Sequence, residues 1–122
     1  MINMDDSARD KGNFAEDMAA MYLRNKGYEI ITRQFSCLFG EIDIIASYDS
    51  YIVFVEVRYR KSGNFGTPAE TVNKRKQERI ILTANEYIQR EDITNRDFRF
   101  DIIEVTGVKE YRVNHIVNAF GV

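Results

Sequence analysis

The sequence predicts an α/β domain in which a mixed β-sheet is flanked by helices. Two segments carry apolar residues at helical spacing, and the segments between and after them contain short runs rich in Ile, Val and Phe that are typical of strands. The elements follow the order helix, three strands, helix, strand (α-β-β-β-α-β), which suits a sheet covered by helices. With 122 residues and no Gly- or Ser-rich linker, we expect a single domain spanning residues 1–122.

The first helix is expected from about Ser7 to Lys26, with Gly27 as its C-terminal stop. Phe14, Met18, Met21 and Tyr22 recur at helical spacing, and Ala15, Ala19 and Leu23 flank them. A first strand is expected from Tyr28 to Ser36, which ends before the stretch that carries the most informative residues.

Two runs rich in Ile and Val, Gly40–Ala46 and Ile52–Arg58, are joined by the short polar link Ser47–Tyr51 and predict a β-hairpin. Because side chains two apart lie on one face of a strand, Glu41, Asp43 and Ile45 share a face. Phe54, Glu56 and Arg58 share a face of the other strand for the same reason. If the hairpin sets these faces side by side, Asp43, Glu56 and Arg58 converge.

Acidic residues inside apolar strands need a physical reason, because burying an unpaired charge is costly. Two neighbouring carboxylates repel each other and favour a cation between them. Mg2+ takes oxygen ligands and keeps several waters, and such a site activates water and stabilises charge on a phosphate. The alternatives are that Asp43 and Glu56 lie on a solvent face or form ordinary ion pairs with a neighbouring Arg.

The segment Tyr59–Gly66 is a basic loop with two glycines. A second helix is expected to begin at Thr67, with Pro68 in its first position and Glu70 completing a capping box, and to run to about Arg90. The apolar residues of its inner face are Val72, Ile80, Ala84, Tyr87 and Ile88.

Positive side chains follow the acidic hairpin and extend into the first half of this helix. We interpret them as candidate contacts to the phosphates of a nucleic acid. The alternative is a solvated face balanced by Glu70 and Glu78. The candidate residues are Arg58, Arg60, Lys61, Lys74, Arg75, Lys76 and Arg79.

The last strand is expected from Phe98 to Val105, where Asp101 and Glu104 are interpreted as edge or pairing groups. Residues 111–122 are expected to form a short strand or a helical turn. His115 is the only histidine, which excludes a His-rich zinc site, and we expect a structural role for it. Cys37 is the only cysteine, which excludes an internal disulfide, and we expect it to be packed or partly exposed.

Composition limits the classes of function. The net charge of −2 argues against a protein built only to hold nucleic acid, although it leaves room for a local basic surface. The sequence contains no run apolar enough to span a bilayer, and its polar start does not match a signal peptide. Together with the single cysteine, these features lead us to expect a cytoplasmic protein without a membrane partner.

The two strands of the hairpin carry a family resemblance. Gly40–Ala46 and Val53–Arg60 are similar to the hallmark G-E-I-D-L-I-A followed by V-F-V-E-V-K/R-x-R of the YraN-type family of uncharacterised small bacterial proteins, which the chain resembles from Gly12 to Phe120. That family resembles the PD-(D/E)XK nuclease superfamily, which includes archaeal Holliday-junction resolvases. The resemblance implies a restriction-endonuclease-like fold.

It also implies metal-dependent hydrolysis of DNA phosphodiester bonds, with branched DNA as one candidate substrate and Mg2+ or Mn2+ as the cofactor. Asp43 and Glu56 would hold the metal. Gly12–Glu16 matches the first-helix region in which such nucleases place a further carboxylate, so Glu16 would bind the metal directly or through water, unless it is a solvated helix residue. Arg58 would face the phosphate or orient the water, and a homodimer is expected by analogy with the resolvases.

The chain departs from the superfamily pattern at Arg58, where a Lys is usual. Arg stays protonated and is a poor general base, whereas a buried Lys can lose its proton. Lys61 and Lys74 are the residues we consider as substitutes. Two further hypotheses therefore remain: a non-catalytic nucleic-acid-binding module on a nuclease scaffold, and a protein-interaction domain in which Asp43, Glu56 and Arg58 form a structural ion-pair network.

Overall fold

The computed structural model describes the backbone of residues 4–61 and 72–121, with side chains from Asn13 onward. Within these ranges the chain forms two helices and five strands, in the order α1 (Met4–Asn25), β1 (Glu29–Cys37), β2 (Gly40–Tyr48), β3 (Tyr51–Arg60), α2 (Lys74–Arg90), β4 (Asp97–Thr106) and β5 (Arg112–Phe120). The predicted order is confirmed up to β4. The C-terminal segment, for which a strand and a helical turn were both considered, is the strand β5.

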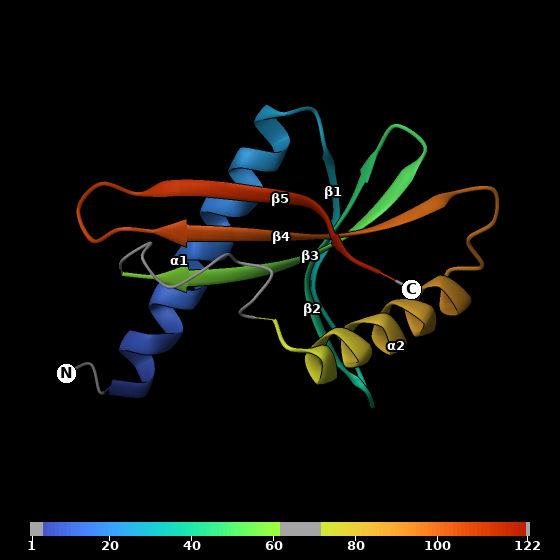
Figure 1. Cartoon of the computed structure of the whole chain (residues 1–122), viewed down its shortest axis with the longest axis horizontal. Helices are drawn as coiled ribbons and strands as arrows, with labels where there is room; N and C mark the ends of the chain where they lie inside the picture. The colour runs from blue at the N-terminus through green and yellow to red at the C-terminus, as the bar shows by residue number, and fades with distance from the viewer. Residues whose placement is uncertain (1–3, 62–71, 122) are drawn as a thin grey trace.

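All five strands belong to one sheet with the order β1-β2-β3-β4-β5. The pair β3–β4 is parallel and the other three pairs are antiparallel, so the sheet is mixed as predicted. The parallel pair requires a crossover, and α2 lies within the connection that provides it. Figure 1 shows α1 crossing one face of the sheet while α2 lies along the other. This is the mixed α/β arrangement expected of a restriction-endonuclease-like fold.

The core consists of two apolar layers, one on each face of the sheet. Alternation along β3 assigns its residues: Val53 and Val55 pack toward α1, whereas Ile52 and Phe54 pack toward α2. The α1 layer is completed by small residues of the helix, which allow it to approach the sheet closely: Ala15, Ala19 and Ala20. The predicted apolar spacing is wrong at Phe14 and Met21, which are exposed. The α2 layer is completed by Ile80, Ala84 and Tyr87, as the helical spacing predicted.

The hairpin between β2 and β3 is tighter than predicted. Both strands extend into the expected link Ser47–Tyr51, and the pairing continues to Tyr48 opposite Tyr51. Only Asp49 and Ser50 remain as the turn, and Asp49 adopts a left-handed φ of 51°. Asp tolerates this conformation better than most residues, which explains how so short a connection closes.

The predicted start of the second helix is wrong at the residues that the structure describes. Thr67, Pro68 and Glu70 lie outside the described residues, but Val72 and Asn73 are not helical and α2 begins at Lys74. The side-chain oxygen of Asn73 accepts a hydrogen bond of 2.9 Å from the backbone N–H of Lys76, which makes Asn73 the N-cap. Val72 is buried as predicted, although it precedes the helix.

Asp101 lies on an interior strand and is fully buried, so it pairs with other groups and is not an edge residue. Its carboxylate accepts two hydrogen bonds of 2.9 Å from Arg99 and is 2.7 Å from Nε2 of His115. Arg99 also donates to the hydroxyl of Tyr28, the residue directly before β1. Burial acts to raise the pKa of Asp101, but the hydrogen bonds from His115 and Arg99 outweigh it and hold that pKa below its usual value.

His115 therefore has the structural position that we expected. Its ring meets that of Tyr22 on α1 edge to face, with 5.5 Å between the ring centroids. The buried polar network thus lies on the α1 side of the sheet. Neither helix, in the part of the chain that the structure describes, is long and apolar enough to cross a membrane.

Candidate active site

A cleft of about 400 Å3 opens on the α2 side of the sheet, between the start of β2, the middle of β3 and the first turns of α2. Both carboxylates that the sequence singled out, Asp43 and Glu56, line it. The predicted convergence of these two side chains is therefore confirmed. The other residues that line the cleft are Phe39, Gly40, Glu41, Asn73, Lys76, Arg79 and Ile80.

Asp43 lies where β2 and β3 begin to separate. The regular pairing of the two strands reaches Ile44 opposite Val55, and just beyond it the backbone N–H of Val57 donates a hydrogen bond of 2.7 Å to the Asp43 carboxylate. A side chain here takes the place of a backbone acceptor. The bond holds the Asp43 carboxylate at the strand that carries Glu56.

The electrostatic state of Asp43 is unusual for an aspartate. Burial, reinforced by the negative charge of Glu56, raises the pKa of Asp43 from 3.8 to about 7, although the Val57 N–H opposes the shift. Within residues 13–61 and 72–121, no Lys, Arg or His forms an ion pair with it. A carboxyl group in this state gains stability from any cation that reaches it.

Glu56 is 7% exposed and already has cationic neighbours. Its Oε1 atom is 2.7 Å from Nζ of Lys76 and 3.7 Å from Nη1 of Arg58. Lys76 comes from the first turn of α2, so the lysine that reaches the acidic pair is neither Lys61 nor Lys74. The helix start explains this: with Asn73 as the N-cap, Lys76 and Arg79 are three residues apart and project on the same side, toward the cleft.

Glu16 does not line the cleft. It is buried on α1, where Arg33 of β1 donates to Oε1 at 2.7 Å and Gln34 donates to Oε2 at 3.2 Å. Gln34 has a left-handed φ of 54°, which lets the consecutive side chains of Arg33 and Gln34 both reach α1. The charge of Glu16 nevertheless contributes to the raised pKa of Asp43, which places Glu16 within electrostatic range of the pair.

The described residues contain no group of three or more His, Cys, Asp or Glu side chains arranged to hold a metal ion. The structure therefore assembles a pair of carboxylates, Asp43 and Glu56, and places Glu16 at the other face in an ion pair with Arg33. A ligand role for Glu16 remains a prediction that requires Arg33 to release it.

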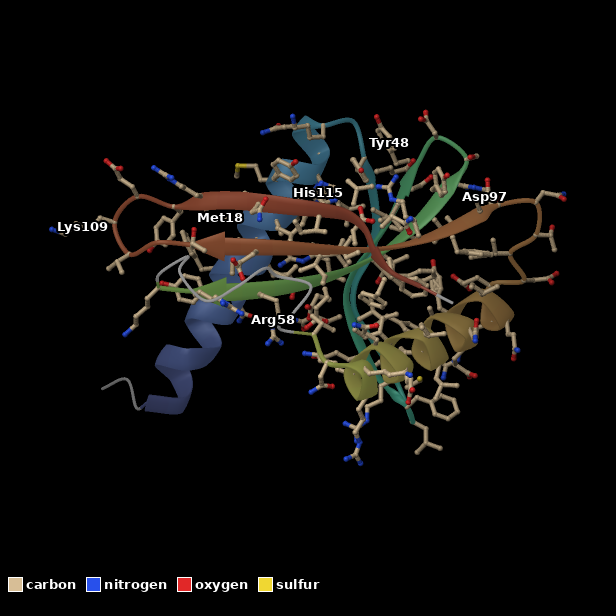
Figure 2. The ribbon with its side chains drawn as sticks, viewed as in Figure 1. Met18, Tyr48, Arg58, Asp97, Lys109 and His115 are labelled. Atoms are coloured by element: carbon tan, nitrogen blue, oxygen red, sulfur yellow. The ribbon has the colours of Figure 1, made fainter. Side chains whose placement is uncertain are left out.

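The predicted basic residues divide into two groups. Lys61, Lys74, Arg75 and Arg79 are exposed, and Arg79 lines the cleft together with the half-buried Lys76. Arg58 and Arg60 instead lie along β3 among carboxylates: Arg58 is near Glu56, and Nε of Arg60 is 3.0 Å from the buried Glu104. Figure 2 labels Arg58 on the ribbon of β3. Glu104 is thus a pairing group, one of the two roles considered for it.

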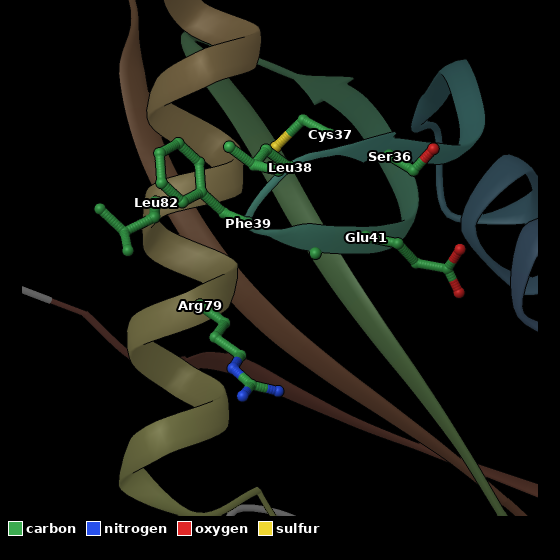
Figure 3. A pocket seen from close by; sticks show the side chains of 8 residues that line it. Ser36, Cys37, Leu38, Phe39, Glu41, Arg79 and Leu82 are labelled. Atoms are coloured by element: carbon green, nitrogen blue, oxygen red, sulfur yellow. The ribbon is translucent and has the colours of Figure 1, made fainter.

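A second hollow of about 770 Å3 adjoins the cleft at the turn between β1 and β2. It shares four lining residues with the cleft: Phe39, Gly40, Glu41 and Arg79. The rest of its wall consists of Ser36, Cys37, Leu38 and Leu82, which Figure 3 shows with the shared side chains. Cys37 is partly buried there, as expected. Sequence reasoning did not identify this hollow, because its two walls come from β1–β2 and α2.

Comparison with known proteins assigns the chain to a family. The model of the uncharacterised protein family UPF0102 matches residues 15–105, which include Glu16, Asp43, Glu56 and Lys76. The chain belongs to the UPF0102 family. This confirms the YraN-type resemblance of the hairpin strands at the level of the family.

Curated UPF0102 proteins align with almost the whole chain. A UPF0102 protein of Caldanaerobacter subterraneus is 48% identical over 89% of this chain and 93% of its own length. One of Clostridioides difficile is 44% identical over 92% of this chain and 97% of its own. A UPF0102 protein of Clostridium botulinum is 47% identical over 92% of this chain and 94% of its own length. None of these three names states an activity, so the chemistry of UPF0102 must be argued from the cleft.

Proposed function

We propose that this UPF0102 protein is a nuclease that hydrolyses DNA phosphodiester bonds with Mg2+ or Mn2+ at the cleft of Asp43 and Glu56. The observation that carries the proposal is the state of Asp43, a carboxyl group with a pKa raised to about 7 beside a second carboxylate in an open cleft. A buried carboxyl group beside a second carboxylate favours a cation at its own oxygens, and perturbed carboxyl groups in clefts are characteristic of functional sites.

The donors fit a hard divalent ion. Asp43 and Glu56 offer carboxylate oxygens, which are the ligands that Mg2+ and Mn2+ prefer, and the cleft leaves room for water. When bound there, the ion supplies a water of lowered pKa and neutralises charge on the phosphate. Asp43 and Glu56 would hold the ion, and Glu16 on α1 would join them only after release from its ion pair with Arg33.

Lys76 is the residue of this chain best placed to act on the phosphate. Its ammonium group contacts Glu56 and borders the cleft. With a cation shared by Asp43 and Glu56, the attraction of Lys76 to Glu56 would be weaker, and the Lys76 ammonium group would donate to a phosphate oxygen. Lys76 on α2 thus takes the role of the lysine that the superfamily pattern usually has at the strand position of Arg58. Arg58 stays beside Glu56 and adds positive charge.

The exposed basic residues at the start of α2 support binding of the flanking backbone. Lys74, Arg75 and Arg79 present charge to solvent next to the cleft, which gives a local basic surface despite the net charge of −2. Lys61, exposed directly after β3, is a further candidate contact to phosphate. We propose DNA as the ligand and a homodimer as the working form, since a branched substrate offers two equivalent strands.

The test is cleavage of branched, duplex and single-stranded DNA with Mg2+, Mn2+ or EDTA. The variants Asp43→Asn and Glu56→Gln keep the shape of the side chain, and Asp43→Asn keeps an acceptor for the Val57 N–H. Metal-dependent cleavage by the wild type that both variants lose, with circular dichroism unchanged, supports the nuclease. Glu110→Gln, an exposed residue between β4 and β5, is the matched control. If the wild type cleaves none of the three substrates with either metal, the nuclease proposal is contradicted.

The 2.7 Å ion pair between Lys76 and Glu56 favours a second candidate function, because a glutamate already neutralised by lysine needs no metal. In that case the protein is a non-catalytic nucleic-acid-binding module, and DNA binding weakens steeply with salt while no metal induces cleavage. A protein-interaction domain with the same ion pairs predicts instead no DNA affinity and no effect of Mg2+ on stability.

A further inference from the structure

The turn between β1 and β2 exposes large apolar side chains beside the candidate active site. Leu38 is 96% exposed and Phe39 is 44% exposed, and Leu82 of α2, which borders the same hollow, is 45% exposed. We call Leu38, Phe39 and Leu82 the apolar tip (Figure 3). Turns are usually polar, and an exposed apolar cluster at a hollow is characteristic of a binding surface.

The turn that carries Leu38 and Phe39 is held against α2. Gly40 has a φ of 153°, and a Cβ atom added there would lie 3.5 Å from Oγ1 of Thr83 and 3.9 Å from Cβ of Arg79. This approach of β2 to the helix brings Phe39, the residue before Gly40, to the hollow that Arg79 also lines. The apolar surface is therefore positioned by packing against the same helix that supplies Lys76 to the cleft.

The tip and the cleft form a continuous surface. Phe39 and Arg79 line both hollows, so the cleft and the hollow at the apolar tip meet at these two residues. Arg79 provides positive charge at the junction, with Lys76 one turn before it on α2. Glu41 is the acidic residue at the same junction, and an anionic group is therefore directed to the Arg79 side.

The ligand that fits must combine an anionic backbone with exposed flat apolar groups. A single nucleic-acid strand has this combination, because its phosphates run beside bases whose faces are open to stacking. A continuous duplex has the phosphates, but its base faces are covered by neighbouring bases. A second copy of this chain brings an apolar tip without the regular anionic backbone that the positive charge of Arg79 favours.

We propose that Phe39 packs against an unpaired base of the strand whose backbone passes Arg79 into the cleft. The ligand class is then single-stranded DNA, or DNA with an unpaired stretch beside the bound phosphate. This inference rests on the proposed function for its nucleic acid, and it specifies which form of nucleic acid the site takes.

Fluorescence anisotropy in EDTA tests the proposal with a labelled single strand and with the duplex of the same sequence. Loss of one base stacked on an aromatic ring is expected to weaken single-strand binding of Phe39→Ala by about 5- to 150-fold, which corresponds to about 1–3 kcal/mol. Duplex binding stays unchanged. Phe39→Tyr keeps the ring and restores single-strand binding. Val117→Ala, a 51% exposed apolar residue on β5, is the matched control and changes neither.

A strand carrying a fluorescent base analogue gives a direct readout, because stacking on a ring quenches its emission. We expect quenching by the wild type and by Phe39→Tyr, and its loss in Phe39→Ala. Equal weakening of single-strand and duplex binding by Phe39→Ala, or no weakening of either, overturns the proposal. So does a change from dimer to monomer in Phe39→Ala with DNA affinity unaltered, since the tip then serves self-association.

The two proposals can fail separately. Phe39-dependent binding of single strands without cleavage in any metal leaves this inference standing and contradicts the nuclease. If continuous duplex is cleaved with metal at the same rate by the wild type and by Phe39→Ala, the nuclease proposal is supported and this inference is overturned. A wild type that binds no single strand at low salt overturns the inference outright.

Discussion

The Nζ atom of Lys76 lies 2.7 Å from Oε1 of Glu56 and joins the first turn of α2 to β3 across the cleft. The contact is possible because α2 begins at Asn73, whose side chain caps the helix at the backbone N–H of Lys76 itself. One residue therefore receives the helix cap and reaches the candidate site. The position of α2 and the electrostatics of the cleft are coupled through it.

Replacing Lys76 by Met is expected to lower metal-dependent cleavage by about 100-fold, the scale of removing one donor to a charged transition state. Stability should fall by only about 1 kcal/mol, because the Lys76 side chain is 40% exposed and its ion pair is screened by solvent. Steady-state cleavage and urea unfolding measure the two effects. Lys76→Arg restores part of the activity if charge is what matters, and unchanged cleavage in Lys76→Met rules out the role assigned to Lys76.

Asp43 makes stability depend on pH in an unusual direction. The folded state binds a proton with a pKa of about 7, against 3.8 for an ordinary aspartate, so between these values the folded state binds more protons than the unfolded state. The contribution is fully present below pH of about 4 and is lost as pH rises through about 7, by at most about 4 kcal/mol. Urea unfolding at several pH values measures this loss.

Asp43→Asn, which cannot titrate, should flatten the stability profile across this window. Mg2+ should stabilise the wild type at pH 8, where both carboxyl groups are ionised, and have little effect at pH 5. A profile in which wild type and Asp43→Asn fall in parallel shows that Asp43 is not the group responsible. Asp101 does not interfere, because its lowered pKa places its own effect at the acid end, where stability is lost as pH falls.

The buried network of Asp101 is expected to contribute to the fold alone. Asp101→Asn leaves the buried Arg99 guanidinium without its carboxylate, and we expect a loss of about 3–5 kcal/mol of stability. His115→Gln keeps a polar partner and should cost about 1–2 kcal/mol. Thermal unfolding checks both. Single-strand affinity of the folded fraction should match the wild type, and a selective loss of DNA binding in His115→Gln would give the network a direct role in recognition.

The salt dependence of DNA binding should separate the basic residues. Each phosphate contact that is removed lowers the slope of log K against log salt concentration by about 1. Arg79→Ala and Lys74→Ala, both exposed at the start of α2, should each show this change. Arg60→Ala should leave the slope unaltered and destabilise the fold, because Arg60 is 17% exposed and lies against the buried Glu104. Anisotropy titrations at several salt concentrations measure the slope for each variant.

Several features of the fold and the site follow from local pattern. The alternation of apolar residues along β3 predicts its two core faces, because successive side chains of a strand point to opposite sides. The same rule places Asp43 and Glu56 on a common side of the hairpin, and the cleft confirms it. Local pattern does not locate the start of α2, because Thr67–Glu70 is a strong capping signal and Asn73, the N-cap in the structure, is also a good N-cap residue.

By itself, the sequence determined the class of fold, the acidic pair and the family resemblance, since each is written in residues that are neighbours along the chain. Only the tertiary structure decided that Lys76 reaches Glu56, that Arg33 pairs with Glu16, and that Phe39 and Arg79 line the same hollow. The residues of each of these pairs come from different elements and are at least 17 positions apart in the chain. Such contacts depend on where helices begin and how they cross the sheet, which local propensity does not encode.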